Sequence, residues 1–342
     1  MTTSVPELAR RFPSVFVTGG AGFIGSHVVR RLVEEGVQVT VVVLPNDRAP
    51  ALDGLPPDRV RRVTGDLSDA SALARAMEGA RLVIHLAAIY AIWLPRPRLM
   101  WEVNVEGTRN IMRAAKMAGV PRVVHTSSIA AIGQRAGMEP ADEDDLFDEW
   151  DGDDYVRSKY VSELEALAFA GPDLEVVAVN PAFPFGANDT APTPTGRMIR
   201  DTLAGKMPFV TDGGFNAVDV RDVAEGHLLG ALHGTSGRRY ILGGDNVSFA
   251  DFAATVAAMA GRRPPRLVMP TRALAGVGRV AEWTATHVTR RPPLMTERSV
   301  TFMAGRWRYF STARAQRELG YNPRPFEEAI AASVEWFRGH PG

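Results

Sequence analysis

Short apolar runs rich in β-branched residues recur through the first half of the chain and alternate with stretches in which apolar residues return every three or four positions. The stretches predict helices, such as 25–36, 69–79 and 104–119, each of which ends at a glycine. Repeated strand–helix–strand units predict an α/β fold, with a doubly wound parallel sheet that carries helices on both faces. The apolar runs predict strands at 15–19, 37–44, 59–67, 81–88, 122–128 and 174–181.

The alternation stops after about residue 181. The Pro- and Gly-rich stretch 180–197 predicts a loop, and the apolar segments 216–220 and 238–244 predict a return of the chain to the sheet. Most of the remaining sequence predicts helices, which suggests a smaller, mostly helical C-terminal lobe. We expect a main domain of residues 1–181, with its sheet revisited by about 216–244, and a second lobe formed by 182–215 and 245–342.

The chain of 342 residues has 39 Lys and Arg and 39 Asp and Glu, so its formal net charge is zero. A neutral chain has no overall field to attract nucleic acid, and we predict no such partner. Cysteine is absent, which excludes a disulfide framework and a cysteine-ligated metal, and we predict no metal site. No apolar run approaches the roughly 20 residues that cross a bilayer, and the N-terminal segment lacks the apolar core of a signal peptide. These features predict a cytoplasmic protein without an integral membrane segment.

A glycine pattern stands between the first predicted strand and the first predicted helix, in the sequence VFVTGGAGFIGSHVVRRL. Gly19 and Gly22 permit a tight turn and a close approach of backbone N–H groups to a pyrophosphate, while Gly25 lets the helix pack against the strand. The helix N-terminus, with Phe23 and Ile24, adds partial positive charge. This context predicts a dinucleotide-binding site and makes the main domain a Rossmann domain.

The second predicted strand should bear an acidic residue near its end if the dinucleotide is NAD. It ends in VVVLPNDR, where Asp47 comes three residues after Leu44 and Arg48 could equally meet the 2′-phosphate of NADP. The sequence therefore favours NADP(H) over NAD(H) by a small margin. Asp66, followed by Leu67 at the end of the third strand, could accept a hydrogen bond from the adenine amine or could cap the next helix.

Catalytic chemistry is indicated by the sequence YVRSK, in which Tyr155 and Lys159 lie one helical turn apart. A tyrosine can donate a proton to a developing alkoxide, and a nearby cation lowers its pKa by about 1–3 units. Ser127 and Ser128 end the fifth strand, where ligand sites of open α/β sheets occur. Tyrosine and lysine four residues apart are also common on ordinary exposed helices, so the pair alone does not decide the matter.

The segments TGGAGFIG, HLAA, NVEGT, TSS and YVRSK occur in this order, and in this combination the chain resembles the extended short-chain dehydrogenase/reductase family, also called the NAD-dependent epimerase/dehydratase family. The resemblance covers nearly the whole chain. It implies that Tyr155 is the catalytic acid or base, and that Lys159 binds the nicotinamide ribose and lowers the tyrosine pKa. It also implies that Ser128 orients the carbonyl oxygen and that Asn104, at the start of its helix, orders the active-site helix and its water.

The same resemblance implies a backbone contact of Ala87 with the cofactor and packing of Pro181 against the nicotinamide ring. The adjacent His85 is interpreted as a packed histidine. Relatives often pair through two long helices, which implies a homodimer built from the helices that carry Asn104 and Tyr155. Within the family, the chain looks especially like the dihydroflavonol 4-reductase-like proteins and the hopanoid-associated sugar epimerase subgroup.

Three functions stay open at this point. The first is the reduction of an aromatic or polycyclic ketone or aldehyde in a pocket lined by Tyr90 and Trp93, with Arg197 as a polar contact. The second is a sugar-nucleotide epimerase or dehydratase that retains NAD, and the third is a dinucleotide sensor without chemistry. Nine acidic residues at 142–154 would repel a nucleotide diphosphate unless this segment is a solvated loop that turns away. We therefore predict the reductase.

Overall fold

The computed structural model describes residues 7–91, 94–206, 209–265, 267–269, 271–289 and 305–340. Within these residues, a central sheet has the strand order β10-β6-β5-β4-β1-β2-β3, and every neighbouring pair in it is parallel. The crossover between β1 and β4 gives the order of a Rossmann fold. The predicted doubly wound parallel sheet is confirmed. Its strands are β1 (Ser14–Thr18), β2 (Gln38–Val43), β3 (Val60–Thr64), β4 (Leu82–His85), β5 (Arg122–Thr126), β6 (Glu175–Pro181) and β10 (Arg239–Leu242).

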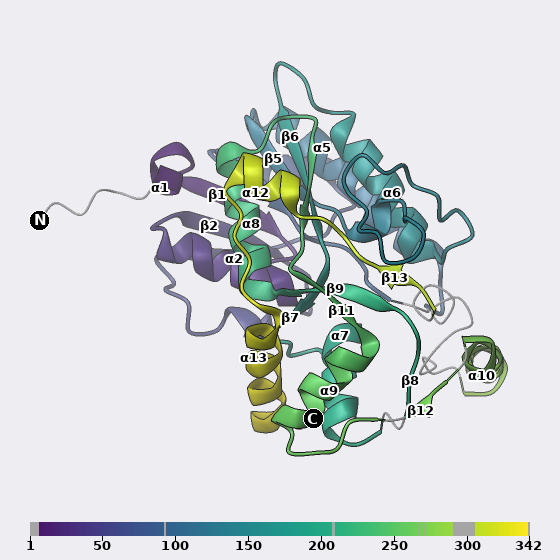
Figure 1. Ribbon diagram of the computed structural model, residues 1–342. Helices are drawn as coiled ribbons and strands as arrows, with labels where there is room; N and C mark the ends of the chain where they lie inside the picture. The colour runs from purple at the N-terminus through teal and green to yellow at the C-terminus, as the bar shows by residue number, and fades with distance from the viewer. Residues whose placement is uncertain are drawn as a thin grey trace, which may run out of the picture.

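Helices cover both faces of the central sheet (Figure 1). Val15 and Val17 of β1 point into one apolar layer, and Phe16 points into the other. Because both faces are buried, the strands read as continuous apolar runs in the sequence. One face carries α2 (Phe23–Glu34), α8 (Val220–His233) and α12 (Ala313–Leu319), and the other carries α3 (Ala70–Ala76), α5 (Gly107–Met117) and α6 (Asp154–Leu167).

A second, smaller layer lies below the central sheet in Figure 1 and has its own apolar core, centred on Phe185, Phe215 and Phe252. Its sheet contains β7 (Phe183–Phe185), β9 (Gly214–Asp219), β11 (Asp245–Ser248) and β13 (Trp307–Arg308), and its helices are α7 (Pro194–Leu203), α9 (Phe249–Met259) and α13 (Phe326–Gly339). The remaining elements are α1 (Glu7–Arg11), α4 (Arg98–Trp101), α10 (Thr271–Thr284), the strand pair β8 (Phe209–Val210) and β12 (Leu267–Val268), the 3-10 turns Pro50–Leu52 and Ile129–Ala131, and the π-helical turns Glu102–Glu106 and Ala285–Thr289.

Two expectations for the segments after residue 181 were wrong. The stretch 180–197 is not all loop, because Phe183–Phe185 pairs with β9 and α7 begins at Pro194. Thr193 caps α7 through its side chain, and a proline suits the first helical turn, so this helix start was present in the sequence. The segment 216–220 does not return to the central sheet, since β9 joins the smaller sheet and β10 alone extends the central one.

Among the described residues, none of the helices is both long and apolar enough to span a membrane.

Candidate active site

The turn between β1 and α2 leaves no room for a side chain at Gly19 or Gly25. Gly19 has a φ of +70°, and its carbonyl oxygen accepts a hydrogen bond from the Gly22 N–H at 3.0 Å. A Cβ on Gly25 would lie 2.1 Å from the Gly19 oxygen, and a Cβ on Gly19 would lie 2.6 Å from the Ala87 nitrogen. Such close backbone packing is the reason for glycine at these positions.

Helix α2 begins at Phe23, with Gly22 at its N-cap and no side chain capping it. The first N–H groups of the helix, including those of Phe23 and Ile24, are therefore directed toward the space beyond the turn, as phosphate binding requires. Ala87 faces this turn from the end of β4 and donates its own N–H to Thr18 at 3.3 Å. The residues present fit the pyrophosphate of a nicotinamide dinucleotide.

Asn104 connects three elements of the site. Its Nδ2 donates to the Ile89 carbonyl at 3.1 Å and to the Ser158 hydroxyl at 3.0 Å, and its Oδ1 accepts from the Ile89 N–H at 2.7 Å. Asn104 lies inside the π-helical turn Glu102–Glu106, so its expected place at the start of a helix was wrong. The preceding helical turn α4 continues into it, and π-turns of this kind are frequent at functional sites.

Ser128, Tyr155 and Lys159 converge at the carboxyl end of β5. The Ser128 side chain is near enough to the Tyr155 hydroxyl to act on the pKa of the tyrosine, and it accepts the Ala130 N–H at 3.1 Å. Asp153 caps the helix that carries Tyr155, because its carboxylate accepts the Val156 N–H at 3.0 Å. By contrast, the neighbouring Ser127 is buried, and its hydroxyl makes no hydrogen bond in the described structure.

The ionisation of this group follows from burial. Burial raises the pKa of Tyr155 to about 12, although the hydrogen bond from Ser128 acts in the opposite direction. The sequence predicted a lowered tyrosine pKa, but the Lys159 ammonium donates to the Thr126 carbonyl at 2.7 Å and is not among the groups that shift Tyr155. Burial also lowers the pKa of Lys159 to about 8, opposed by the charge of Glu163. Tyr155 is consequently a protonated donor at neutral pH.

Of the residues expected around the substrate, Tyr90 lies in direct contact with Tyr155. The Tyr90 ring is tilted against the Tyr155 ring with centroids 4.6 Å apart. The exposed Arg197 of α7 is near enough for its charge to act on the Tyr90 hydroxyl, where it favours a lower pKa. Trp93 lies outside the described residues. Pro181 is buried at the end of β6, beside the site.

In the turn after β2, the carboxylate of Asp47 accepts the Ala49 N–H at 2.7 Å and so stabilises that turn. Arg48 is exposed at this turn, and Arg62 of β3 donates to its carbonyl at 3.4 Å. Asp66 accepts from the N–H of Ser68 at 2.7 Å, and this hydrogen bonding lowers the pKa of Asp66.

Asp66 does not cap the next helix, because Asp69 accepts the Ala72 N–H and fills that role. Leu67 packs against Gly107, where a Cβ would lie 2.8 Å from it. Arg62 was not expected at the site, because its position in the middle of a strand gave no signal. Ser158 was not expected there either, although this residue lies inside YVRSK.

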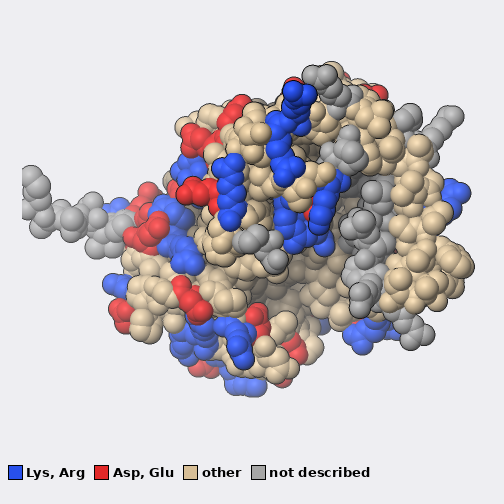
Figure 2. All heavy atoms as spheres, turned by 90° about the horizontal axis from the view of Figure 1, so that it is seen from below, with Lys and Arg blue, Asp and Glu red and all other residues tan. Residues whose placement is uncertain are grey.

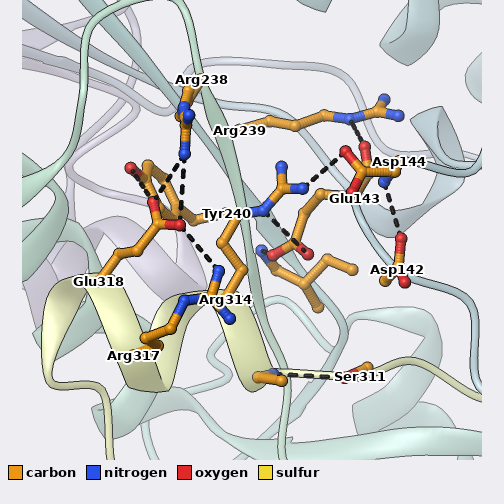
Figure 3. A network of polar contacts seen from close by, with 12 residues as sticks. Asp142, Glu143, Asp144, Arg238, Arg239, Tyr240, Ser311, Arg314, Arg317 and Glu318 are labelled. Atoms are coloured by element: carbon orange, nitrogen blue, oxygen red, sulfur yellow. Dashed lines mark hydrogen bonds and ion pairs between the residues drawn. The ribbon is translucent and has the colours of Figure 1, made fainter.

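The acidic segment 142–154 is largely neutralised, which corrects its interpretation as a solvated loop. Arg135 pairs with Asp142 and Asp145 at 2.9 and 3.0 Å. Arg314 binds Asp144 at 2.6 Å, and the buried Glu143 accepts the N–H of Ile241 (Figure 3). The charge of this segment therefore gives little reason to exclude a nucleotide diphosphate.

The buried Glu149 of the same segment receives both terminal nitrogens of Arg308, at 2.6 and 2.9 Å. This ion pair joins the segment to β13, which lies more than 150 residues further along the chain.

His85 is a packed histidine, as the sequence analysis interpreted it. Its ring lies between the hydroxyls of Thr18 at 2.6 Å and Thr108 at 3.0 Å, and burial lowers its pKa to about 3. His125, on the adjacent strand, is also buried with a lowered pKa. Neither ring is available as a base at the surface of the site.

A parallel sheet in this order, with a glycine turn of this geometry at its first strand, defines a Rossmann-type dinucleotide-binding protein. The family model described as the NAD dependent epimerase/dehydratase family matches residues 15–243, and the chain belongs to this family.

Known proteins similar to this chain cover nearly all of it. A putative dihydroflavonol 4-reductase of Synechocystis is 38% identical over 331 residues, 95% of this chain and 94% of the relative. Sterol demethylase protein B of Methylococcus capsulatus is 34% identical over 326 residues, 95% of this chain and 98% of the relative. Further relatives are named as hydroxysteroid dehydrogenases. The chain is accordingly an enzyme of a family that uses a nicotinamide dinucleotide, and the sensor interpretation has no support.

Two solved structures illustrate the range of the fold. The crystal structure of gox2253 has a TM-score of 0.83 and 39% identity, and the match covers 96% of this chain and 98% of that one. The structure of MoeE5 in complex with UDP-glucuronic acid and NAD has a TM-score of 0.73 and 27% identity, with 96% and 99% covered.

Proposed function

We propose that the protein reduces a ketone or aldehyde by hydride transfer, with Tyr155 as the proton donor. The observation that carries the proposal is the convergence of Ser128 with a half-buried, protonated Tyr155, since the Ser128 side chain is near enough to act on the pKa of the tyrosine. Reduction creates an alkoxide that needs a proton, and a tyrosine whose pKa is about 12 still holds one at neutral pH. Relatives named as reductases and dehydrogenases support the same type of reaction.

The side chains would act as follows. When bound, the nicotinamide ring supplies a hydride, which adds to the carbonyl carbon. The Ser128 hydroxyl donates a hydrogen bond to the carbonyl oxygen, and Tyr155 transfers its proton to that oxygen as negative charge develops. The Lys159 ammonium, one turn along the helix, would hold the ribose hydroxyls of the bound dinucleotide. Asn104 fixes the segment around Ile89 and the active-site helix through Ser158.

We also propose which parts of the chain bind the dinucleotide and which bind the substrate. Residues 1–181, with β10, bind the dinucleotide, and residues 182–215 and 245–342 bind the substrate. Tyr90, Arg197 and Trp93 would contact the substrate. An aromatic or polycyclic carbonyl compound suits the ring of Tyr90, and relatives whose names refer to sterols and dihydroflavonol support this class.

For the cofactor we propose NADP(H). The end of β2 has no free carboxylate to bind a ribose 2′-hydroxyl, since Asp47 is engaged in its own turn. The exposed Arg48, with Arg62 beside it, could bind the 2′-phosphate instead. Asp66 and Leu67 remain candidates for contact with the adenine.

A second candidate is an epimerase or dehydratase that acts on a nucleotide sugar and retains NAD. Two observations favour it: the neutralised acidic segment no longer argues against a diphosphate, and MoeE5, a structural relative, is found with UDP-glucuronic acid and NAD. The face shown in Figure 2 also has Lys and Arg side chains gathered beside a hollow, which would suit an anionic ligand.

We propose in addition that the protein is a homodimer formed through α5 and α6. Exposed apolar side chains on these helices, Met117 at the end of α5 and Leu164 on α6, support this assembly. Sedimentation analysis should give twice the mass of the chain.

The decisive test uses Tyr155→Phe, which removes one hydroxyl. We expect turnover of carbonyl probes such as phenanthrenequinone with NADPH to fall about 100- to 10,000-fold, the usual contribution of a general acid. Binding of NADPH, followed by its fluorescence, should be nearly unchanged. Full activity of the variant, or no turnover of any carbonyl probe by the unaltered protein, would contradict the proposal.

The reductase and the epimerase are distinguished by the dinucleotide that the purified protein carries. About one equivalent of tightly held NAD, released on denaturation, would favour the epimerase or dehydratase. Reversible binding of added NADPH would favour the reductase.

A further inference from the structure

A buried carboxylate lies one helical turn beyond Lys159. Glu163 of α6 is 1% exposed, and its two oxygens accept different donors: Asn180 Nδ2 at 2.6 Å and Arg239 Nη1 at 3.0 Å. Burial of a charge at this depth is costly unless the charge is paired and hydrogen-bonded. Both oxygens of this buried carboxylate are therefore paired, one with a neutral amide and one with a guanidinium.

Asn180 carries the contact on to the proposed site. Its Nδ2 also donates to the carbonyl oxygen of Ser128 at 2.9 Å. One amide therefore connects the helix of Tyr155 and Lys159, through Glu163, to the backbone of Ser128, whose side chain lies near the Tyr155 hydroxyl. Asn180 directly precedes Pro181, so the same residue also fixes the end of β6.

Arg239 anchors the other side of Glu163. Its guanidinium donates to the carbonyls of Ala131 at 3.2 Å, Glu143 at 2.9 Å and Asp145 at 3.0 Å, in addition to Glu163. Figure 3 shows Arg239 beside the acidic segment. The loop that follows Ser128 and the acidic segment before Tyr155 are therefore held to one cation on β10, the strand that ends the central sheet.

We propose that Glu163, acting through Asn180, is a positioning residue that holds Ser128 in register with Tyr155 and Lys159 for the proposed reaction. The inference rests on the proposed function, because it assigns Glu163 and Asn180 a role only in relation to that catalytic group. Neither residue would touch the substrate.

The charge of Glu163 has a second effect, on Lys159. The groups that face Lys159 are Glu163 on its own helix, His85 on β4, His125 on β5 and the Thr126 carbonyl. Burial keeps both histidines neutral, so Glu163 is the group that favours the protonated lysine, against a burial effect that brings the pKa of Lys159 down to about 8. Removal of this carboxylate lowers the lysine pKa further. If the reaction needs the ammonium, the alkaline limb of the activity profile must then move to lower pH.

The test compares Glu163→Gln with Glu165→Gln. Glu165 lies two residues further on the same helix and also forms an ion pair, with Arg109 of α5 at 2.6 and 3.0 Å, but this pair is directed away from Asn180 and Ser128. With phenanthrenequinone and NADPH, we expect E163Q to lower kcat at least tenfold, to change KM less than threefold, and to move the alkaline limb down by about one pH unit. E165Q should leave both unchanged, and E163D should restore part of the rate.

Asn180→Ala provides an independent arm that keeps the carboxylate and retains the test if E163Q does not fold. It should lower kcat with little movement of the alkaline limb, because the connection to Ser128 is lost while Glu163 and its ion pair with Arg239 remain. The inference would be overturned if E163Q behaved like E165Q in both rate and pH profile, or if N180A kept the full kcat. Full activity of Y155F would overturn the proposed function instead, so the two failures can be distinguished.

Discussion

The glycine turn of β1 and α2 and the acidic segment 142–154 both stood out in the sequence, yet the structure confirms the expected surroundings of only the first. The glycine turn lies within seven residues, Gly19 to Gly25, and the close contacts of Gly19 and Gly25 are to the turn itself and to the adjoining end of β4. The acidic segment takes its properties from arginines elsewhere in the chain, such as Arg308 and Arg314. A local pattern is informative when the structure that it forms is also local.

The difference concerns charge in particular. Nine carboxylates in thirteen residues suggested an acidic surface, and the field of such a surface would have influenced the choice of substrate. The fold returns β13 and α12 to this segment, so the charges become ion pairs, some of them buried. The predictions that follow test whether the acidic segment is structural and the glycine turn functional.

The largest effect is expected for Glu149→Ala, which removes the carboxylate that neutralises the buried Arg308. Loss of one partner of a buried ion pair typically costs about 3–5 kcal/mol. We expect the free energy of unfolding, measured by urea denaturation, to fall by that amount. The affinity of the folded variant for NADPH should stay unchanged, and a loss of less than 1 kcal/mol would show that this ion pair is not structural.

A smaller loss of stability, with a large loss of binding, is expected for Gly25→Ala. Its methyl group would lie 2.1 Å from the Gly19 carbonyl oxygen, so the turn must open. Overpacking of this kind costs about 1–3 kcal/mol, while the displaced N–H groups should lower the affinity for dinucleotide at least tenfold. Fluorescence titration with NADPH and urea denaturation measure the two effects. Gly171→Ala is the matched control for stability at a turn, since its φ is not in the left-handed region and a Cβ there meets no atom closer than 3.9 Å. Normal NADPH affinity in G25A would contradict the assignment of the cradle.

Much of the fold could be predicted because its signals are periodic and local. Strands buried on both faces read as apolar runs, and the glycine turn was expected between a strand and a helix, where the structure has it. The place of Tyr155 and Lys159 on one helix followed from their spacing. By contrast, Asn104 was expected at a helix start but lies in a π-helical turn. The helix begins earlier, at α4, and no capping side chain marks that start.

The rest of the site depends on contacts between distant parts of the chain. The hydrogen bond of Asn180 to Glu163 joins residues 17 positions apart, and Arg239 reaches Glu163 across 76. Neither contact follows from helical or strand spacing, because each joins a strand residue to a residue on a separate helix. The raised pKa of Tyr155 was missed for a related reason, since burial by surrounding elements outweighs the helical neighbour that the sequence displays.

The smallest effect is expected for Asp144→Asn, the exposed counterpart of Glu149 in the same segment. The Asp144 side chain is 81% exposed and pairs with Arg314 at 2.6 Å. An exposed ion pair contributes about 0–1 kcal/mol, because water screens it. The Arg314 hydrogen bond lowers the pKa of Asp144, so the contribution is present above the ordinary value of 3.8 and is lost as the pH falls through the lowered value. Urea denaturation should therefore show a small deficit for D144N at neutral pH that disappears in strong acid and shrinks at high salt. A deficit as large as that of Glu149→Ala would mean that the position of a carboxylate in the sequence, and not its burial, decides its contribution to stability.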